Sequence, residues 1–559
     1  MSNHLSPAQA LPIDVLRSIL KWVTLEKGSQ LHGYSFQLEN LKELLTVSSA
    51  WRQVALEFLW RQVNFTINDN KGEVQLKRPK WVKNNALPHN AANFVKEVIV
   101  NVSMSDIVGG VGHRLLNNYI GHTKLFPLAN KLTLSIEECM GYHVDDKDLA
   151  IANALEFAKL LKSIAPASTT IKVIYEKEYL QTVNSNNNFG SSLEEEEVFI
   201  MITNVLYTGT KQAKLNLLNV DVKNPSVIDL LPLLSSLWIE CEKFPDVGTS
   251  LVRKSASTLR HLTVCTCDAN KLICDTNGEA IVYPNLQELH MYGCVRNSTH
   301  SKDMANKSIL FPLLQAARLY DSYPFHNDVL FRGNTTTLEY LEVGLDYDTI
   351  ITLNQEDAFG SKQRILRHVV ISEDYGNISL SLVPEADMSR FLSNLVGAAK
   401  RLTVGEPNLL RACITAVHNG SGFQNIKVLN LRSYSQSLCV ILDLLKLLPA
   451  LVNLRSNICG LGPELEGITF EELPDYIAST YSDTGKNLQV WAITSFTIHG
   501  TTQIIDYILL LALACPKLRR IESKSNTTSD YHIQVAKALE SGPYSKYATQ
   551  LNRLLNVAL

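Results

Sequence analysis

A short apolar pattern recurs along most of the chain, and it constrains the fold more than any other feature. Each copy alternates large apolar residues with polar ones, as in residues 286–291, which read LQELHM. This alternation is typical of a β-strand with one buried face. Apolar anchors lie 22 to 33 residues apart, at positions 237, 262, 289, 319, 341, 369, 402, 429 and 454. Roughly a dozen similar units at such a period predict a stacked, elongated array.

An apolar helical run that ends at a proline precedes several of these strands. The prolines are Pro232, Pro312, Pro449 and Pro516. Because the residue before a proline disfavours the helical conformation, each run predicts a helix, a turn and then a strand. Such a unit cannot bury its apolar face alone, but it can do so against its neighbours. The pattern resembles leucine-rich repeats in an irregular form, which implies an α/β solenoid with a curved parallel sheet.

An ordinary α/β domain with a parallel sheet would also alternate strands with helices. No glycine-rich phosphate-binding loop opens any of the helical runs, and the number of similar units favours the solenoid. Both architectures predict parallel strands.

Residues 11–67 have a different pattern, which predicts three short amphipathic helices. The first begins at Leu11-Pro12, where the missing N–H of proline costs nothing. The second is expected over residues 41–48 and the third over residues 51–63. Three helices in so few residues form only a marginal core, so this segment is expected to dock on something else.

The order of residues in this segment resembles an F-box, in the variant common in fungal proteins. The matching motifs are Leu11-Pro12, then Leu44-Leu45-x-Val47-x-x-x-Trp51-Arg52-x-x-Ala55, then Leu59-Trp60-x-x-Val63. In that family the motif packs against the adaptor Skp1, which recruits a cullin-RING ubiquitin ligase. The connection over residues 24–40 is longer and more polar than the usual one. The resemblance implies a Skp1-binding set of Leu11, Pro12, Ile13, Val15, Leu16, Ile19, Leu44, Val47, Trp51 and Leu59.

These patterns predict five segments along the chain. They are an N-terminal tail (1–10), an F-box-like helical module (11–67), a polar and basic linker (68–90), an irregular leucine-rich-repeat solenoid (91–528) and a C-terminal helical cap (529–559). Within the solenoid, residues 184–197 have the composition of a mobile acidic loop.

Charge and hydropathy narrow the classes of partner and the location. A net charge of −3 gives no case for nucleic acid or an anionic membrane surface. No apolar stretch is long enough to span a bilayer, and no secretory signal is visible. The 10 cysteines are too few for a disulfide framework. We therefore expect a soluble protein of the cytoplasm, the nucleus or both.

The sequence gives little sign of catalytic or metal chemistry. Cys265, Cys267 and Cys274, with His290 and Cys294, lack the paired spacing of a zinc site, and buried free thiols explain these cysteines better. No nucleophile elbow, phosphate-binding loop, zinc-protease motif or dinucleotide fingerprint occurs. We expect no cofactor, no metal and no enzyme activity.

The polar residues that alternate with the apolar anchors are candidates for binding a protein substrate. They are Arg260, Glu288, His290, Glu339, Arg367, Lys427 and Arg519. The leading hypothesis is a substrate-recognition subunit of an SCF-type ubiquitin ligase, whose partners are a Skp1-like adaptor, its cullin complex and an unknown protein substrate. One alternative is a non-ligase scaffold of leucine-rich repeats with a helical N-terminal cap. Another is an α/β enzyme, which would need a deep pocket with convergent titratable groups.

Overall fold

The structure is a computed structural model. It describes residues 11–26, 35–36, 44–68, 72–77, 91–121, 126–138, 146–177, 193–218, 229, 231–240, 246–265, 272–275, 277, 279–293, 310–320, 337–345, 350, 366–373, 383–397, 399–405, 423–482, 484–496, 501–523 and 531–556. The chain divides into two compact units, Met1–Thr266 and Cys267–Leu559. Within the described segments, no helix combines the length and the apolar character needed to cross a membrane.

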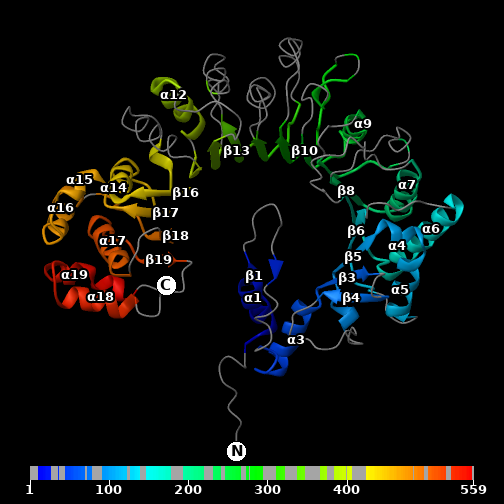
Figure 1. Ribbon diagram of the computed structural model, residues 1–559, viewed down its shortest axis with the longest axis horizontal. Helices are drawn as coiled ribbons and strands as arrows, with labels where there is room; N and C mark the ends of the chain where they lie inside the picture. The colour runs from blue at the N-terminus through cyan, green and yellow to red at the C-terminus, as the bar shows by residue number, and fades with distance from the viewer. Residues whose placement is uncertain are drawn as a thin grey trace, which may run out of the picture. The chain divides into compact units, whose positions relative to one another are not determined.

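The first unit begins with helices and continues as a mostly parallel sheet (Figure 1). Its N-terminal part contains α1 (Ile13–Thr24), the antiparallel pair β1 (Leu25–Glu26) and β2 (Ser35–Phe36), and α3 (Ser49–Leu59). The sheet contains β3 (Gln62–Asn68), β4 (Glu73–Lys77), β5 (Glu97–Ser103), β6 (Lys131–Glu138), β7 (Thr170–Lys177), β8 (Gln212–Leu218), β9 (Ser236–Glu240) and β10 (His261–Cys265). The remaining helices are η4 (Ala91–Asn93), α4 (Met104–Val108), α5 (Val111–Ile120), α6 (Lys147–Ile164), α7 (Leu193–Tyr207) and α9 (Asp246–Ser255).

Strands of this first sheet pair in parallel in the order β3-β5-β6-β7-β8-β9-β10, and β4 pairs with β3 in the antiparallel sense. Figure 1 shows α4 to α7 and α9 on one side of these strands. We call the other side of the strands, in either unit, the open face. Alternation decides which side chains reach the helices: Val98, Val100 and Val102 of β5 are buried, whereas the residues between them are half-buried.

The second unit repeats the arrangement with a parallel ladder from β11 to β19. Its strands are β11 (Glu288–Tyr292), β12 (Ala316–Tyr320), β13 (Tyr340–Leu345), β14 (His368–Glu373), β15 (Arg401–Val404), β16 (Val428–Ser437), β17 (Asn453–Gly460), β18 (Val490–Phe496) and β19 (Arg520–Ser523). Its helices are α12 (Glu385–Val396), η9 (Phe423–Asn425), α14 (Leu438–Leu447), α15 (Pro463–Glu466), α16 (Leu473–Thr480), α17 (Thr501–Ala514), α18 (Tyr531–Glu540), η10 (Ser545–Tyr547), α19 (Ala548–Leu551) and η11 (Asn552–Asn556).

One core row crosses the second sheet in strict register. It runs through Leu289, Ala317, Leu341, Val369, Leu402, Leu429, Leu454, Trp491 and Ile521, all of them buried. The periodic apolar anchors therefore form the predicted stack, and the mixed α/β fold with long parallel sheets is confirmed. It is consistent with a repeat solenoid. Leu319, the anchor expected in β12, is not in this row. It lies two residues further along the strand, and Ala317 occupies the position in the row.

The helices expected over residues 41–63 differ from the structure. Of residues 41–48, only Leu44 is helical in the part described, and residues 45–47 form a turn. The third helix ends at Leu59, and Val63 lies in β3. Val63, Phe65 and Ile67 alternate with polar residues, and pairing with β5 and β4 satisfies their backbone groups as a strand. Between Leu59 and Gln62 the spacing of apolar residues therefore changes from that of a helix to that of a strand.

Two further segments also contain elements that the sequence did not indicate. The polar linker expected over residues 68–90 contains β4, which pairs with β3. The acidic run 194–197 belongs to α7, where Glu196 is buried and Lys147 forms an ion pair with Glu197. The rest of the expected acidic loop, residues 184–192, lies outside the described residues.

Candidate functional site

Helices α1 and α3 pack against each other at the start of the first unit. Leu16 and Leu20, one turn apart on α1, are fully buried, as are Val54 and Ala55 on α3. Ser48 determines where α3 begins, because its hydroxyl accepts a hydrogen bond from the backbone N–H of Trp51 at 3.4 Å. The two helices thus share a small apolar core.

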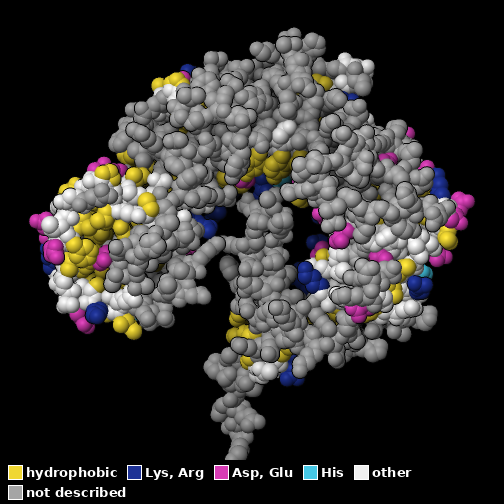
Figure 2. All heavy atoms as spheres, in the orientation of Figure 1, with side chains coloured by type: hydrophobic (Ala, Val, Ile, Leu, Met, Phe, Trp, Pro, Cys, Tyr) yellow, Lys and Arg dark blue, Asp and Glu magenta, His cyan; other side chains and the backbone are white. Residues whose placement is uncertain are grey.

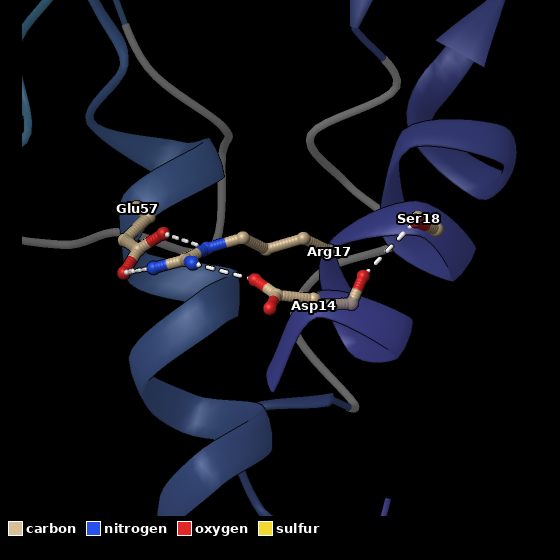
Figure 3. A network of polar contacts seen from close by, with 4 residues as sticks. All are labelled: Asp14, Arg17, Ser18 and Glu57. Carbon is tan, nitrogen blue, oxygen red and sulfur yellow. Dashed lines mark hydrogen bonds and ion pairs between the residues drawn. The ribbon is translucent and has the colours of Figure 1, made fainter. Parts of the chain in front are cut away.

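Arg17 connects the two helices through a polar network (Figure 3). Its Nε and Nη2 donate to the two carboxylate oxygens of Glu57 on α3, each at 3.0 Å. Its Nη1 donates to Oδ1 of Asp14 at 3.1 Å, and the Ser18 hydroxyl donates to the Asp14 carbonyl at 3.0 Å. The hydrogen bond and charge of Glu57 raise the pKa of Arg17 above its ordinary value. A two-pronged guanidinium–carboxylate contact of this kind fixes orientation as well as distance.

The residues expected to bind an adaptor separate into an exposed and a buried group. Ile13, Val15 and Val47 are large apolar side chains with 37%, 42% and 36% of their surface exposed. Pro12 is exposed too, and Leu11, Ile19 and Leu44 are half-buried. Leu16, Trp51 and Leu59 are buried. Figure 2 shows hydrophobic side chains at the surface around these two helices.

A pocket of about 600 Å³ opens beside the Arg17 network. Its lining includes Arg17 of α1, Glu57 and Phe58 of α3, Arg61 before β3, and Phe94 and Lys96 before β5. The backbone N–H of Lys96 donates to the carbonyl of Arg61 at 2.8 Å, which places these two cationic residues side by side at the start of neighbouring strands. Sequence patterns could not find this pocket, because it is assembled from three separate segments.

The residues expected to bind a substrate occupy two different places on the strands. Glu288 and His290 lie in β11 on the open face, where they alternate with the buried Leu289 and Met291. The other candidates each lie one residue before a strand. Their backbone N–H groups donate to carbonyls just before the neighbouring strand, which extends the sheet hydrogen bonding by one residue. These candidates are Arg260 in the first unit and Glu339, Arg367, Lys427 and Arg519 in the second.

Among these residues, Arg367 and Glu339 form an ion pair at 3.4 Å, with both side chains about half exposed or more. The candidates are therefore at the surface, but they do not converge on one point. A pair this exposed contributes little to stability, typically about 0–1 kcal/mol.

A polar and aromatic network lies on the open face of β11 to β14. Its centre is Glu342, which is only 6% exposed and lies 3.2 Å from Nε of Arg318 on the neighbouring strand. The hydroxyl of Tyr340 donates to Glu342 at 2.5 Å, and the guanidinium of Arg318 lies 5.5 Å from the centre of the Tyr340 ring. Burial and the neighbouring Glu342 both raise the pKa of Tyr320.

Aromatic contacts extend this network along the strands. Tyr292 stacks on Tyr320 with ring centres 5.4 Å apart, and Tyr340 meets His368 edge-on at 4.9 Å. The predicted substrate-binding set includes Glu288 and His290 on this face, but not Arg318 or the tyrosines. All of these residues alternate with buried ones and so point to the open face. The sequence does not show which of them become neighbours, because that depends on the register between strands.

Two lysines face each other on the open face of the first unit. Lys172 of β7 is in register with Lys214 of β8. Burial, and then the charge of Lys214, lower the pKa of Lys172, whereas the charge of Glu97 in β5 raises it. Like charges directly opposite each other on neighbouring strands are unfavourable.

No group of three or more metal-binding side chains occurs among the residues that the structure describes. Cys265 and Cys274 are half-buried rather than buried, and Cys267 and Cys294 lie outside the described segments. By contrast, burial raises the pKa of the Cys515 thiol to about 12.

Comparison with known proteins does not assign this chain to a family. No family model and no curated protein matches it. One solved structure with some similarity is titled "Crystal structure of Rad7 and Elc1 complex in yeast". It is 11% identical, with a TM-score of 0.29 over 88% of this chain and 90% of that chain.

Proposed function

We propose that this chain is a substrate-recognition subunit of an SCF-type ubiquitin ligase. Helices α1 and α3 would bind a Skp1-like adaptor and, through it, the cullin complex. The sheets would bind a protein substrate. The observation that carries the proposal is the exposure of Ile13, Val15 and Val47 in a segment whose residues resemble an F-box. Apolar side chains of this size and exposure are suited to a protein interface.

Such a subunit works by effective concentration. Binding a substrate on a shared scaffold raises the local concentration of its lysines near the transferring enzyme, and the chain itself performs no chemistry. In this proposal the network around Arg318 and Glu342 is the part of the open face that contacts a substrate most strongly. Tyrosine and arginine are the side chains most often found in binding hot spots.

A second candidate function is a scaffold outside any ligase, in which the two helices only cap the first sheet. The buried Trp60 favours it, because α3 passes into β3 through Trp60 and Arg61 alone and is thus continuous with the sheet. In this alternative Leu16, Trp51 and Leu59 would have a structural role only.

Binding of a purified Skp1-type adaptor to the full chain separates the two functions. The double variant Ile13→Asp/Val15→Asp changes only exposed side chains, so it should fold normally and lose adaptor binding at least tenfold. Leu149→Asp is the matched control, because Leu149 is also exposed on a helix, at 56%, and lies away from α1. Failure of the wild-type chain to bind the adaptor would leave the scaffold as the better description.

A further inference from the structure

The pocket between α1, α3 and the start of β5 carries an excess of positive charge. Three cationic side chains, Arg17, Arg61 and Lys96, and one carboxylate, Glu57, line it. Glu57 is committed to Arg17 by two hydrogen bonds, and Asp14 adds a third to the same guanidinium. Arg61 and Lys96 are therefore left with two positive charges that no lining residue neutralises.

The nearest acidic residue in sequence does not supply the missing charge. Glu97 directly follows Lys96, but its side chain belongs to the open face, where its charge acts on Lys172. It is not part of the pocket lining. Within the described residues, neither Arg61 nor Lys96 has a side-chain hydrogen bond or ion pair. Both side chains are exposed, so they are accessible to a ligand.

Two aromatic side chains form part of the pocket wall. Phe58 of α3 is 8% exposed and Phe94 is half-buried, and both line the pocket beside the two cations. A simple inorganic anion would satisfy the cations but make no apolar contact with the exposed part of the Phe94 ring. A carboxylate on a peptide brings both the negative charge and apolar atoms, and it matches the planar, forked guanidinium of Arg61.

The pocket also adjoins the surface that we assign to the adaptor. Ile13 precedes Arg17 by one helical turn, so the two lie on the same side of α1. A protein that covers the exposed Ile13 would therefore reach the pocket without crossing the helix. We propose that this pocket binds an acidic segment of the adaptor, whose Asp or Glu carboxylate contacts Arg61 and Lys96 together. This assignment rests on the proposed function.

Carbodiimide cross-linking tests the contact directly, because the reagent joins a carboxylate to an amine only where the two touch. In the complex of the full chain with purified adaptor, mass spectrometry should find an amide between Lys96 Nζ and an adaptor Asp or Glu. Lys159, exposed on α6, should give no such product. Lys96→Arg should keep the complex and lose the cross-link. Absence of any cross-link at Lys96 in a complex that forms would overturn the assignment.

Charge reversal provides the second measurement. Arg61→Glu and Lys96→Glu should each weaken adaptor binding by about tenfold or more, since each places a like charge against the acidic segment. Arg114→Glu, at an exposed position on α5, should leave binding unchanged. Equal weakening by all three variants would indicate general charge attraction and overturn the assignment. Thermal unfolding of each variant is the check that the fold is retained.

These results also separate the two proposals. If the wild-type chain binds the adaptor and the pocket variants bind equally well, only the pocket assignment fails. If the wild-type chain binds no adaptor, the proposed function fails and the pocket assignment fails with it.

Discussion

Arg17 forms a two-pronged polar contact between the two N-terminal helices. Its guanidinium reaches Glu57 on α3 with two hydrogen bonds and Asp14 on its own helix with one. The surrounding apolar core is small, so orientation depends on polar contacts more here than in the sheets. Arg17 also lines one side of the pocket. Because it pairs with Glu57, no other carboxylate in the lining is left to neutralise Arg61 and Lys96.

Replacing Arg17 should loosen α1 without unfolding the rest of the first unit. In Arg17→Ala the two-pronged contact is lost, and the amides of α1 should exchange hydrogen faster while those of β5 to β8 stay protected. Ser18→Ala is the matched control, because it removes only the hydrogen bond to the Asp14 carbonyl within the same helix. Unchanged exchange in α1 would mean that the apolar contacts of Leu16 and Leu20 alone fix the helix.

Helix α17 is mostly apolar and buried, but it contains one acidic residue, Asp506. Residues Ile508 to Ala514 of this helix are all buried, and Asp506 lies half-buried beside them. Burial raises the pKa of Asp506 from 3.8 to about 6, and the nearby Tyr544 hydroxyl opposes this by lowering it. The charged form is therefore disfavoured in the folded state.

This shift predicts that stability falls as the pH rises through the folded pKa of Asp506. The penalty is absent below about pH 4, where the carboxyl is protonated in both states, and complete above about pH 6. It amounts to about 1–2 kcal/mol, because solvent reaches the half-buried group and screens part of the effect. Urea unfolding of Asp506→Asn should lack this loss, whereas Asp148→Asn, at an exposed position in α6, should keep it. Parallel pH profiles for wild type and Asp506→Asn would contradict the assignment.

The strands could be predicted from the sequence, but their register could not. The two-residue alternation predicted the strands and their buried face, and the helical runs between the strands predicted parallel pairing. The sequence could not place Ala317 instead of Leu319 in the core row, since register depends on the neighbouring strands. It also could not bring Arg318 to Glu342, or Arg61 to Lys96, because these pairs form between segments far apart in the chain.

The helical pattern of residues 41–63 shows a different limit. Apolar residues at helical spacing also fit a turn, a capped helix and then a strand, and the competition is decided by tertiary pairing. Ser48 is the N-cap of α3, so a helix over residues 41–48 cannot continue into it. Val63 pairs with Val98 of β5 and is therefore part of a strand. The adaptor-binding candidates were selected by motif alone, so the set mixed exposed residues such as Val15 with core residues such as Leu16.

At the scale of the whole molecule, a stack of repeats needs a cover on its last member, because a terminal repeat has no following neighbour to bury its apolar face. In the second unit, α18, α19 and the short helices around them pack on α17. Lys546 and Tyr547 bind the carboxylate of Asp475 in the first turn of α16, and the Tyr547 hydroxyl donates to it at 2.5 Å. These contacts attach the C-terminal segment to two different helices.

Arg553 attaches this segment to the C-terminal end of α17. Its Nη2 donates to the carbonyls of Ala512 and Cys515 at 2.5 and 3.1 Å, and its Nε donates to that of Leu518 at 3.4 Å. A cation at the C-terminal end of a helix satisfies carbonyls that have no partner within the helix and interacts well with its dipole. The C-terminal segment therefore covers the apolar side of α17 and also caps its end.

Deleting residues 531–559 should expose α17 and make the chain self-associate, which size-exclusion chromatography with light scattering would detect. Arg553→Ala is the graded version: it should lower the free energy of unfolding by about 2 kcal/mol, since charged hydrogen bonds to backbone carbonyls are lost. Arg519→Ala, one residue before β19, is a matched control that removes an exposed arginine from the same region. A monomeric deletion variant with a fully protected α17 would mean that the stack ends stably without its C-terminal helices.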